Sequence, residues 1–211
     1  MAAIGTSTAP GLGARPQDLD DAAVVAAVLH GDRDAFRVLV ERESTSVIRA
    51  CHRILGDLHE AEDAAQEAFV IAYRSLASWR ADGPFGAWVS RIAVRVALRQ
   101  ASRRRGITWL DPLSGPDTGG MSELERALAS GPAVGMDPAT QALRRERDRG
   151  VRAAVASLDE PYREVVALRF FADLPLAEIA RQTDRPLGTV KTQLHRGLLR
   201  LRALVEAEGR S

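Results

Sequence analysis

Residues 158–206 read LDEPYREVVALRFFADLPLAEIARQTDRPLGTVKTQLHRGLLRLRALVE. Helical spacing predicts one helix over LDEPYREVVALRFF, capped by Asp159 with Pro161 in its first turn, and a second over PLAEIARQT. After the short connection TDRP, a long third helix begins at Leu187. Two helices joined by a turn of three or four residues form a helix-turn-helix. This stretch therefore predicts an all-α domain that binds DNA.

The third helix of this stretch has an apolar side and a polar side, at 100° per residue. Its apolar side consists of Leu187, Val190, Leu194, Gly197, Leu198 and Leu201. Gly197 in the middle of that side predicts close approach of another helix. The polar side consists of Gly188, Thr189, Lys191, Thr192, His195 and Arg196. Short hydroxyls and long cations in the first half of a helix, with no acid, are typical of a recognition helix. The alternative is a solvated helix face.

The rest of the chain divides by composition. We expect a disordered tail (1–17), a helical domain (18–106), an extended linker (107–143) with a short helix around 122–128, and the second helical domain (144–211). In the first domain, helices are expected over about 19–29, 32–54, 59–77 and 85–103, the first capped by Asp18 or Asp20. The predicted fold is all-α, with two small helical domains joined by a flexible linker.

Charge is distributed unevenly along the 211 residues, although the net charge is only +1. Residues 81–106 contain one acid and six Arg, and residues 185–202 contain five basic residues and no acid. Acidic residues predominate in residues 18–80, which contain 12 acids and 7 Arg. They also predominate in the linker. Two separated basic segments in an otherwise acidic chain indicate a polyanion contacted at two places, or else two solvated helix faces.

Several classes of protein are excluded by the sequence. The single Cys51, which we assign to the core, rules out a disulfide framework or a Cys-rich zinc module. No run approaches the roughly 20 apolar residues of a membrane span, and the N-terminus lacks the pattern of a secretory signal. Glu60, Asp63 and Glu67 lack the Glu-x-x-His pattern of a carboxylate metal site. We therefore expect a cytoplasmic protein without membrane insertion, metal, cofactor or catalytic residues.

The segment HEAEDAAQEAFVIAYRSL (59–76) has an inner and an outer helix face. The inner residues are Ala64, Ala65, Ala68, Phe69, Ala72 and Tyr73. The outer residues are Asp63, Gln66, Glu67 and Val70. Carboxylates with an embedded Val suit docking against a basic, partly apolar protein surface. The alternative is that these outer side chains are simply exposed to solvent.

The segment SWRADGPFGAWVSRIAVRVALRQASRRR (78–105) combines cations and aromatic residues. Its core positions are Phe85, Val89, Ile92 and Val96. Arg91, Arg95 and Arg99 form a row beside Trp88, and Trp79 precedes a Gly-Pro loop. Aromatic rings and cations beside a loop are typical of single-strand binding. Core packing is the favoured alternative for Trp88, and both interpretations stay open for Trp79.

Together these segments resemble a known family. EAEDAAQEAF followed by FGAWVSRIA resembles region 2 of the extracytoplasmic-function (ECF) sigma factors of the sigma-70 family, and LDEPYREVVALRFF with LAEIARQTDRPLGTVKTQLHRGLLRLR resembles their region 4. The resemblance covers about 19–206 and implies a subunit that gives RNA polymerase core its promoter specificity. It implies the polymerase clamp helices and flap, promoter DNA and an anti-sigma factor as partners.

The resemblance also implies roles for residues. Docking on polymerase falls to Asp63, Gln66, Glu67 and Val70. Opening and capture of the −10 element fall to Trp79, Arg80, Asp82, Phe85, Trp88, Arg91, Arg95 and Arg99. Reading of the −35 duplex falls to Gly188, Thr189, Lys191, Thr192, His195 and Arg196. The linker would thread through polymerase, with Trp109 and Leu110 as its first anchor. Arg95 departs from the Asn frequent in the family, so the family's −10 preference does not transfer.

Two other functions remain open at this point. A helix-turn-helix regulator with an N-terminal helical sensor domain would bind an operator tightly by itself, whereas a sigma factor binds weakly until polymerase core is added. A helical enzyme or adaptor would leave the two basic segments unexplained, and turnover without nucleic acid would support it.

Overall fold

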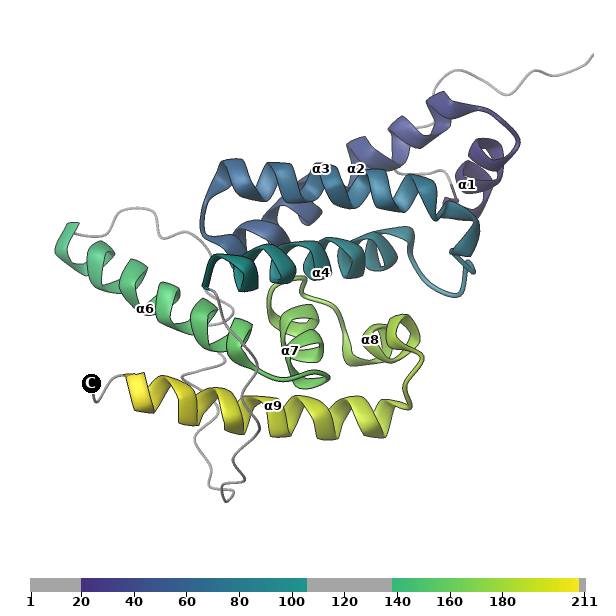
Figure 1. Cartoon of the computed structure of the whole chain (residues 1–211). Coiled ribbons are helices and arrows are strands. Elements are labelled where there is room, and N and C mark those ends of the chain that lie inside the picture. Colours follow the sequence, from purple (N-terminus) through teal and green to yellow (C-terminus); the bar gives the residue numbers. More distant parts are fainter. Residues whose placement is uncertain (1–19, 106–137, 209–211) are drawn as a thin grey trace, which may run out of the picture.

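The structure is a computed structural model in which residues 20–105 and 138–208 are described (Figure 1). Its elements are α1 (Asp21–Leu29), α2 (Arg33–Leu55), α3 (Leu58–Arg74), the 3₁₀ turn η2 (Leu76–Ser78), α4 (Phe85–Arg105), α6 (Pro138–Ser157), α7 (Tyr162–Phe170), α8 (Leu176–Thr183) and α9 (Leu187–Glu208). Every regular element in these two ranges is helical, which confirms the all-α prediction. The expected tail, the expected helix around 122–128 and the anchor Trp109–Leu110 lie outside the described residues.

Short polar residues and one glycine fix where the first helices begin and end. Asp20 caps α1 by accepting a hydrogen bond from the backbone N–H of Ala22, and the other expected cap, Asp18, lies outside the described residues. Asp32 and Asp57 cap α2 and α3 in the same way. Gly56 ends α2 at a φ of 77°, a left-handed conformation that glycine adopts without steric cost. The four helices expected in this half are all present.

The core of the first half lies between α2, α3 and α4. The inner face of α3 is buried as predicted, except for Tyr73, which is 40% exposed. Tyr73 lies at the edge of the core, where its ring packs against Phe36 with centroids 5.0 Å apart. Phe85, at the first position of α4, is fully buried, and Cys51 is buried as expected. Ile92 is only partly buried.

The second half begins with α6, whose first residue, Pro138, falls inside the expected linker. Residues 138–143 are therefore helical, and proline suits the first position of a helix because it has no N–H to satisfy. The predicted cap of α7 was wrong: α7 begins at Tyr162, and the Asp159 side chain caps nothing. Instead the Asp159 carboxylate lies 3.8 Å from the Arg200 guanidinium, and its backbone carbonyl accepts a hydrogen bond from Arg163.

Helix α9 packs on α7 through its predicted apolar side. Val190, Leu198 and Leu201 are buried, and Leu194 is partly buried. A Cβ on Gly197 would lie 2.8 Å from Cγ2 of Val166, so the close approach of another helix is confirmed. Leu187 was predicted to be buried but is 40% exposed, because it is the first residue of α9, beyond the contact with α7.

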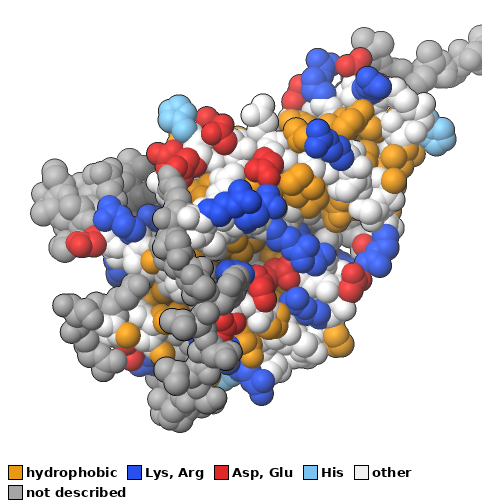
Figure 2. Space-filling model, in the orientation of Figure 1, with side chains coloured by type: hydrophobic (Ala, Val, Ile, Leu, Met, Phe, Trp, Pro, Cys, Tyr) orange, Lys and Arg blue, Asp and Glu red, His pale blue; other side chains and the backbone are white. Residues whose placement is uncertain are grey.

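The two halves pack against each other (Figure 1). Helix α4 of the first half lies over α7 and α8 of the second, and buried residues from both halves form one continuous apolar cluster. On the face shown in Figure 2, Lys and Arg side chains gather across the middle beside acidic side chains. Within 20–105 and 138–208, no helix combines the length and the hydrophobicity that crossing a bilayer would need.

Candidate nucleic-acid and protein interfaces

The polar side of α9 is exposed over its whole predicted length. All six of the residues expected on it are exposed: Gly188, Thr189, Lys191, Thr192, His195 and Arg196. The helix-turn-helix turn presents this face, because Asp184 ends α8 in a left-handed conformation (φ 54°) and Pro186 starts the next turn. A groove of about 520 Å³ runs beside the face and is lined by Pro161, Tyr162, Pro186, Gly188, Thr189, Thr192, Gln193 and Arg196.

The cations of α9 fall into two groups. Arg200 lies 4.2 Å from the ring centre of Tyr162, and Arg202 pairs with Glu206 at 2.7 Å, so both are held by their own domain. Lys191 and Arg196 have no acidic partner among the described residues. The first half of α9 therefore presents positive charge that no side chain described in the structure neutralises.

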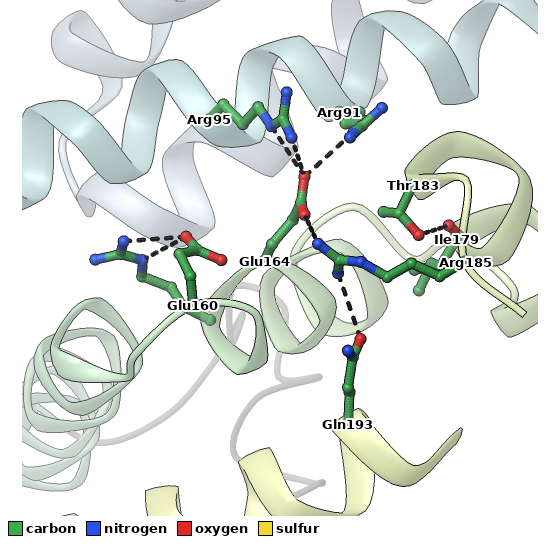
Figure 3. Close-up of polar contacts among 9 residues, drawn as sticks. Arg91, Arg95, Glu160, Glu164, Ile179, Thr183, Arg185 and Gln193 are labelled. Carbon is green, nitrogen blue, oxygen red and sulfur yellow. Dashed lines mark hydrogen bonds and ion pairs between the residues drawn. The ribbon is translucent and has the colours of Figure 1, made fainter. Parts of the chain in front are cut away.

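The Arg row of α4 is paired with acids, unlike the free surface that the sequence suggested (Figure 3). Nε of Arg91 lies 3.2 Å from Oε1 of Glu164 in α7, and Nη2 of Arg95 lies 2.8 Å from the same oxygen. Arg99 instead pairs with Glu67 of α3 at 2.5 Å. Half or more of the Arg95 and Arg99 side chains stays exposed, whereas only 21% of Arg91 does.

Glu164 is a buried carboxylate held by three guanidinium groups. Besides Arg91 and Arg95, Arg185 of its own half donates a hydrogen bond to Oε2 at 3.1 Å, and Arg185 also contacts Gln193 of α9 (Figure 3). Burial alone would raise the pKa of Glu164, but the charges of Arg95, Arg91 and Arg185 outweigh it and lower that pKa. Burial and then the charge of Arg95 lower the pKa of Arg91. Glu164 is thus ionised and central to a cluster with excess positive charge.

The second half also contacts the loop before α4. Arg80 pairs with Asp184 at 2.5 Å and lies 3.6 Å from Asp82. A Cβ on Gly83 would come within 2.7 Å of a Glu178 carboxylate oxygen, so α8 reaches this loop closely. A side chain at this position would have to displace the Glu178 carboxylate.

The aromatic residues around this loop belong to the core more than to the surface. Trp88 is partly buried and packs on Phe85 with ring centres 5.5 Å apart, which supports the core alternative for Trp88. Trp79 is also partly buried, 6.2 Å from Phe85 between ring centres. Its indole N–H is buried and has no hydrogen-bond acceptor in the described part of the chain. In this arrangement neither indole ring is a free stacking platform.

The outer face of α3 borders an apolar groove that the sequence did not predict. The groove holds about 620 Å³ and is lined by Phe36, Val40, Ser44, Ile48, Glu62, Asp63, Ala65, Gln66, Phe69, Val70 and Tyr73. Three of the four predicted docking residues line it; the fourth, Glu67, turns to Arg99 and Gln100 of α4. Phe36, Val40 and Ile48 recur at helical spacing on α2, a signal from which the groove could have been found.

No metal site is formed by the residues that the structure describes. Groups of three or more His, Cys, Asp or Glu side chains that could hold an ion do not occur in 20–105 or 138–208. The buried Cys51 thiol has a pKa raised by burial to about 12 and so stays protonated. The described surfaces offer cations, carboxylates and apolar side chains for binding.

Comparison with known proteins identifies the family. Residues 39–107 match the family model for sigma-70 region 2, and residues 148–201 match that for sigma-70 region 4. The ECF RNA polymerase sigma factor SigW of Bacillus subtilis is 33% identical over 176 residues, which cover 83% of this chain and 91% of that protein. The chain belongs to the ECF sigma factors of the sigma-70 family. This sigma factor is an alternative one that serves promoter-specific initiation, and the regulator with a sensor domain is not favoured.

Other relatives agree with this assignment. RNA polymerase sigma-H factor of Pseudomonas aeruginosa is 32% identical over 83% of this sigma factor and 89% of its own length. The ECF RNA polymerase sigma-E factor of Escherichia coli K12 is 32% identical over 85% of this chain and 91% of its own. The solved structure of CnrH in complex with the cytosolic domain of CnrY has a TM-score of 0.55 at 22% identity, covering 89% of this chain and 97% of that one. This last likeness shows a shared fold.

Proposed function

We propose that this sigma factor docks on RNA polymerase core through the α2–α3 groove and selects promoters with two DNA-binding surfaces. The second half reads −35 duplex with α9, and the first half opens and holds the −10 element with α4 and the loop before it. The observation that carries this proposal is the exposed α9 face, on which Lys191 and Arg196 lie among hydroxyls with no acidic partner in the described chain.

The composition of the α9 face suits duplex DNA. Cations such as Lys191 and Arg196 neutralise phosphates and release counterions, which provides affinity in a salt-dependent manner. Thr189, Thr192 and His195 are short enough for a helix in the major groove to bring them to base edges. The burial of Val190 and Leu198 against α7 fixes which face of the helix is presented.

The α4 surface suits a strand separated from its partner. Arg91, Arg95 and Arg99 are spaced to follow a phosphate backbone, and Arg80 and Asp82 lie in the loop at its start. Unstacking a base costs a few kcal/mol, which contacts to phosphates and to the edges of Trp79 and Trp88 would offset. Phe85 is fully buried and packs against both indole rings, so its proposed role is to position them.

The α2–α3 groove suits a helix of a large protein partner. Its floor is apolar, and Asp63 and Gln66 lie at its rim with Val70, which is 44% exposed. An apolar centre with a polar rim is the usual anatomy of a protein interface. We assign this surface to the clamp helices of polymerase, and we expect region 4 to contact the flap. Glu67 supports the surface indirectly, through its pair with Arg99.

The remaining assignments follow from the family. We propose that residues 18–106 and 144–211 are the functional domains and that 107–143 links them through polymerase. We expect the protein to act in the cytoplasm, where its polymerase is, without a cofactor or catalysis of its own. An anti-sigma factor is the expected inhibitor.

Run-off transcription with purified core polymerase on a library of genomic promoter fragments tests the proposal. The double variant Lys191→Ala and Arg196→Ala should lose most −35-dependent transcripts while still co-eluting with core. The matched control is Arg37→Ala with Arg49→Ala, which removes two exposed cations from α2. Unchanged promoter use by the α9 variant would refute the assignment of α9 to the −35 element.

Gel filtration with core polymerase tests the docking surface. Asp63→Arg should weaken association because it reverses a charge at the rim of the groove. Glu41→Arg is the control, since Glu41 is exposed on α2 and does not line the groove. Normal assembly of the Asp63 variant would remove the groove from the proposed interface.

A further inference from the structure

Helix α4, which carries the proposed −10 surface, begins without a cap of its own. Pro84 holds the capping position, because its backbone carbonyl accepts hydrogen bonds from the N–H groups of Ala87 (3.1 Å) and Trp88 (3.4 Å). Proline has no side-chain oxygen that could accept a hydrogen bond from the first turn, and that turn contains no acidic residue. The first N–H groups of α4 therefore need acceptors from elsewhere in the molecule.

Two other helices supply carboxylates at this point. Asp21 is the first residue of α1, which lies at the same end of the first half as the start of α4 (Figure 1). Its Oδ2 accepts a hydrogen bond from the backbone N–H of Phe85 at 2.7 Å. Glu43 of α2 lies against Gly86, where a Cβ would come within 2.9 Å of the carboxylate carbon. The partial positive charge at a helix N-terminus favours both carboxylates there.

Arg42 joins these two carboxylates. Its Nη2 pairs with Oδ1 of Asp21, and its Nε donates to Oε1 of Glu43 at 2.9 Å. Each carboxylate gives one oxygen to Arg42 and keeps the other, Oδ2 or Oε2, close to the backbone of α4. Only 17% to 20% of each of the three side chains is exposed, so these are not the solvated surface pairs that contribute little to stability.

The start of α4 positions the aromatic residues of the proposed −10 surface. Phe85, whose N–H is held by Asp21, packs against Trp88 at 5.5 Å and Trp79 at 6.2 Å between ring centres. Because Phe85 is fully buried, a shift of its backbone moves both indole rings. The loop 80–84 ends at the same point and shifts with it. The position of the first turn of α4 therefore determines the shape of this surface.

We propose that Asp21, Arg42 and Glu43 form a remote cap that positions the start of α4 for opening of the −10 element. The three are positioning residues and act through the backbone of Phe85 and Gly86, without contact to DNA. This inference rests on the proposed function of α4 and its loop. It predicts that loss of the remote cap slows the opening of the promoter, whereas the initial binding of duplex DNA, which α9 provides, is unchanged.

Abortive initiation by the holoenzyme, at a promoter obtained from the run-off library, separates these two steps. The dependence of the lag time on holoenzyme concentration gives both the affinity of the closed complex and the rate constant of opening. Asp21→Ala should lower the opening rate constant about tenfold, which corresponds to about 1.4 kcal/mol and to the loss of a cap of ordinary strength. The affinity of the closed complex should stay unchanged. A role in stability alone would reduce the amount of active holoenzyme but not this rate constant.

Three further variants make the result decisive. Asp21→Asn should retain most of the opening rate, because its amide oxygen still accepts the N–H of Phe85. Asp34→Ala, which removes an exposed acid from the first turn of α2, is the matched control and should open like the wild type. Gly86→Ala should slow opening about threefold, because the new methyl group displaces the Glu43 carboxylate. Alanine favours a helix more than glycine does, so this variant serves if Asp21→Ala fails to fold.

The outcomes separate the inference from the proposed function. Unchanged opening rate constants in both Asp21→Ala and Gly86→Ala overturn the remote cap and leave the promoter assignments standing. An equal loss of closed-complex affinity and opening rate also overturns it, because such a loss indicates general damage to the first half. The proposed −10 surface is tested by the double variant Trp88→Ala and Arg95→Ala. If that holoenzyme opens the promoter at the wild-type rate, the −10 surface itself is refuted.

Discussion

Replacing Gly197 with Ala tests how α9 is seated on α7. The new Cβ would lie 2.8 Å from Cγ2 of Val166 and 3.3 Å from Cβ of Tyr162. Carbon atoms pack best about 3.5–4.0 Å apart, so Val166 or the whole helix has to move by roughly 1 Å. Overpacking of this size costs about 1–3 kcal/mol, while alanine in a helix interior gains about 1 kcal/mol over glycine. The net loss of unfolding free energy should be about 0–2 kcal/mol.

Because the cost of overpacking and the gain in helix propensity nearly balance, the decisive quantity is the coupling free energy between positions 197 and 166. Val166→Ala removes the methyl group that the new Cβ would meet, so Gly197→Ala should be stabilising in that background by about 1 kcal/mol. Urea unfolding of the wild type, the two single variants and the double variant gives the coupling free energy, which we expect to exceed about 1 kcal/mol. Additivity within about 0.5 kcal/mol would refute the packing argument. The single variant Gly197→Ala should also bind −35 DNA more weakly than its loss of stability alone explains, because α9 shifts relative to α7.

Other predictions concern charge and burial. The affinity of the holoenzyme for duplex DNA should fall with salt, and the slope of log affinity against log salt concentration measures how many phosphates are contacted. If Lys191 and Arg196 each contact one phosphate, replacing both should make this slope shallower by about 1.8. An unchanged slope would exclude those contacts. Since the folded protein lowers the pKa of Glu164, its contribution to stability is present above the usual glutamate pKa of about 4.3 and is lost as pH falls through the lowered value. The stability difference between wild type and Glu164→Gln should therefore be constant from pH 7 to 5 and shrink at pH 3, and a constant difference down to pH 3 would contradict this. With a pKa of about 12, the Cys51 thiol of the folded protein should resist iodoacetamide at pH 8. It should react fully in about 6 M guanidinium, which unfolds even hyperstable domains. Alkylation of the native protein would show that the buried site opens.

Helix positions and faces could be predicted because local signals determine them. Asp20, Asp32 and Gly56 mark helix ends through their own hydrogen bonds and backbone conformation. Periodicity then identifies the face that is buried, but it does not tell how far the core extends along that face. Tyr73 at the end of α3 and Leu187 at the start of α9 lie on the correct faces and are still exposed, because no neighbouring helix continues over them.

The pairing of the Arg row could not be predicted from its pattern. Cations at every fourth position of α4 indicate that an anion lies alongside, and this holds equally for solvent ions, DNA phosphates or a carboxylate of the same chain. Glu164 is 69 residues beyond Arg95, so no local spacing connects them. Only the packing of α7 under α4 makes the choice among these anions.

The burial of α7 gives the physical reason for that pairing. Seven of its nine residues are buried, so the helix has no polar face on which a charged residue is solvated. Lone buried carboxylates are too costly to persist, and Glu164 must therefore meet cations from outside its helix. The basic segments of the chain lie in α4 and around α9, and Glu164 takes partners from α4 and from the turn before α9. A short helix with charges but without a solvent face thus predicts a salt-bridged interface, and here that interface joins the two proposed DNA-binding surfaces of the sigma factor.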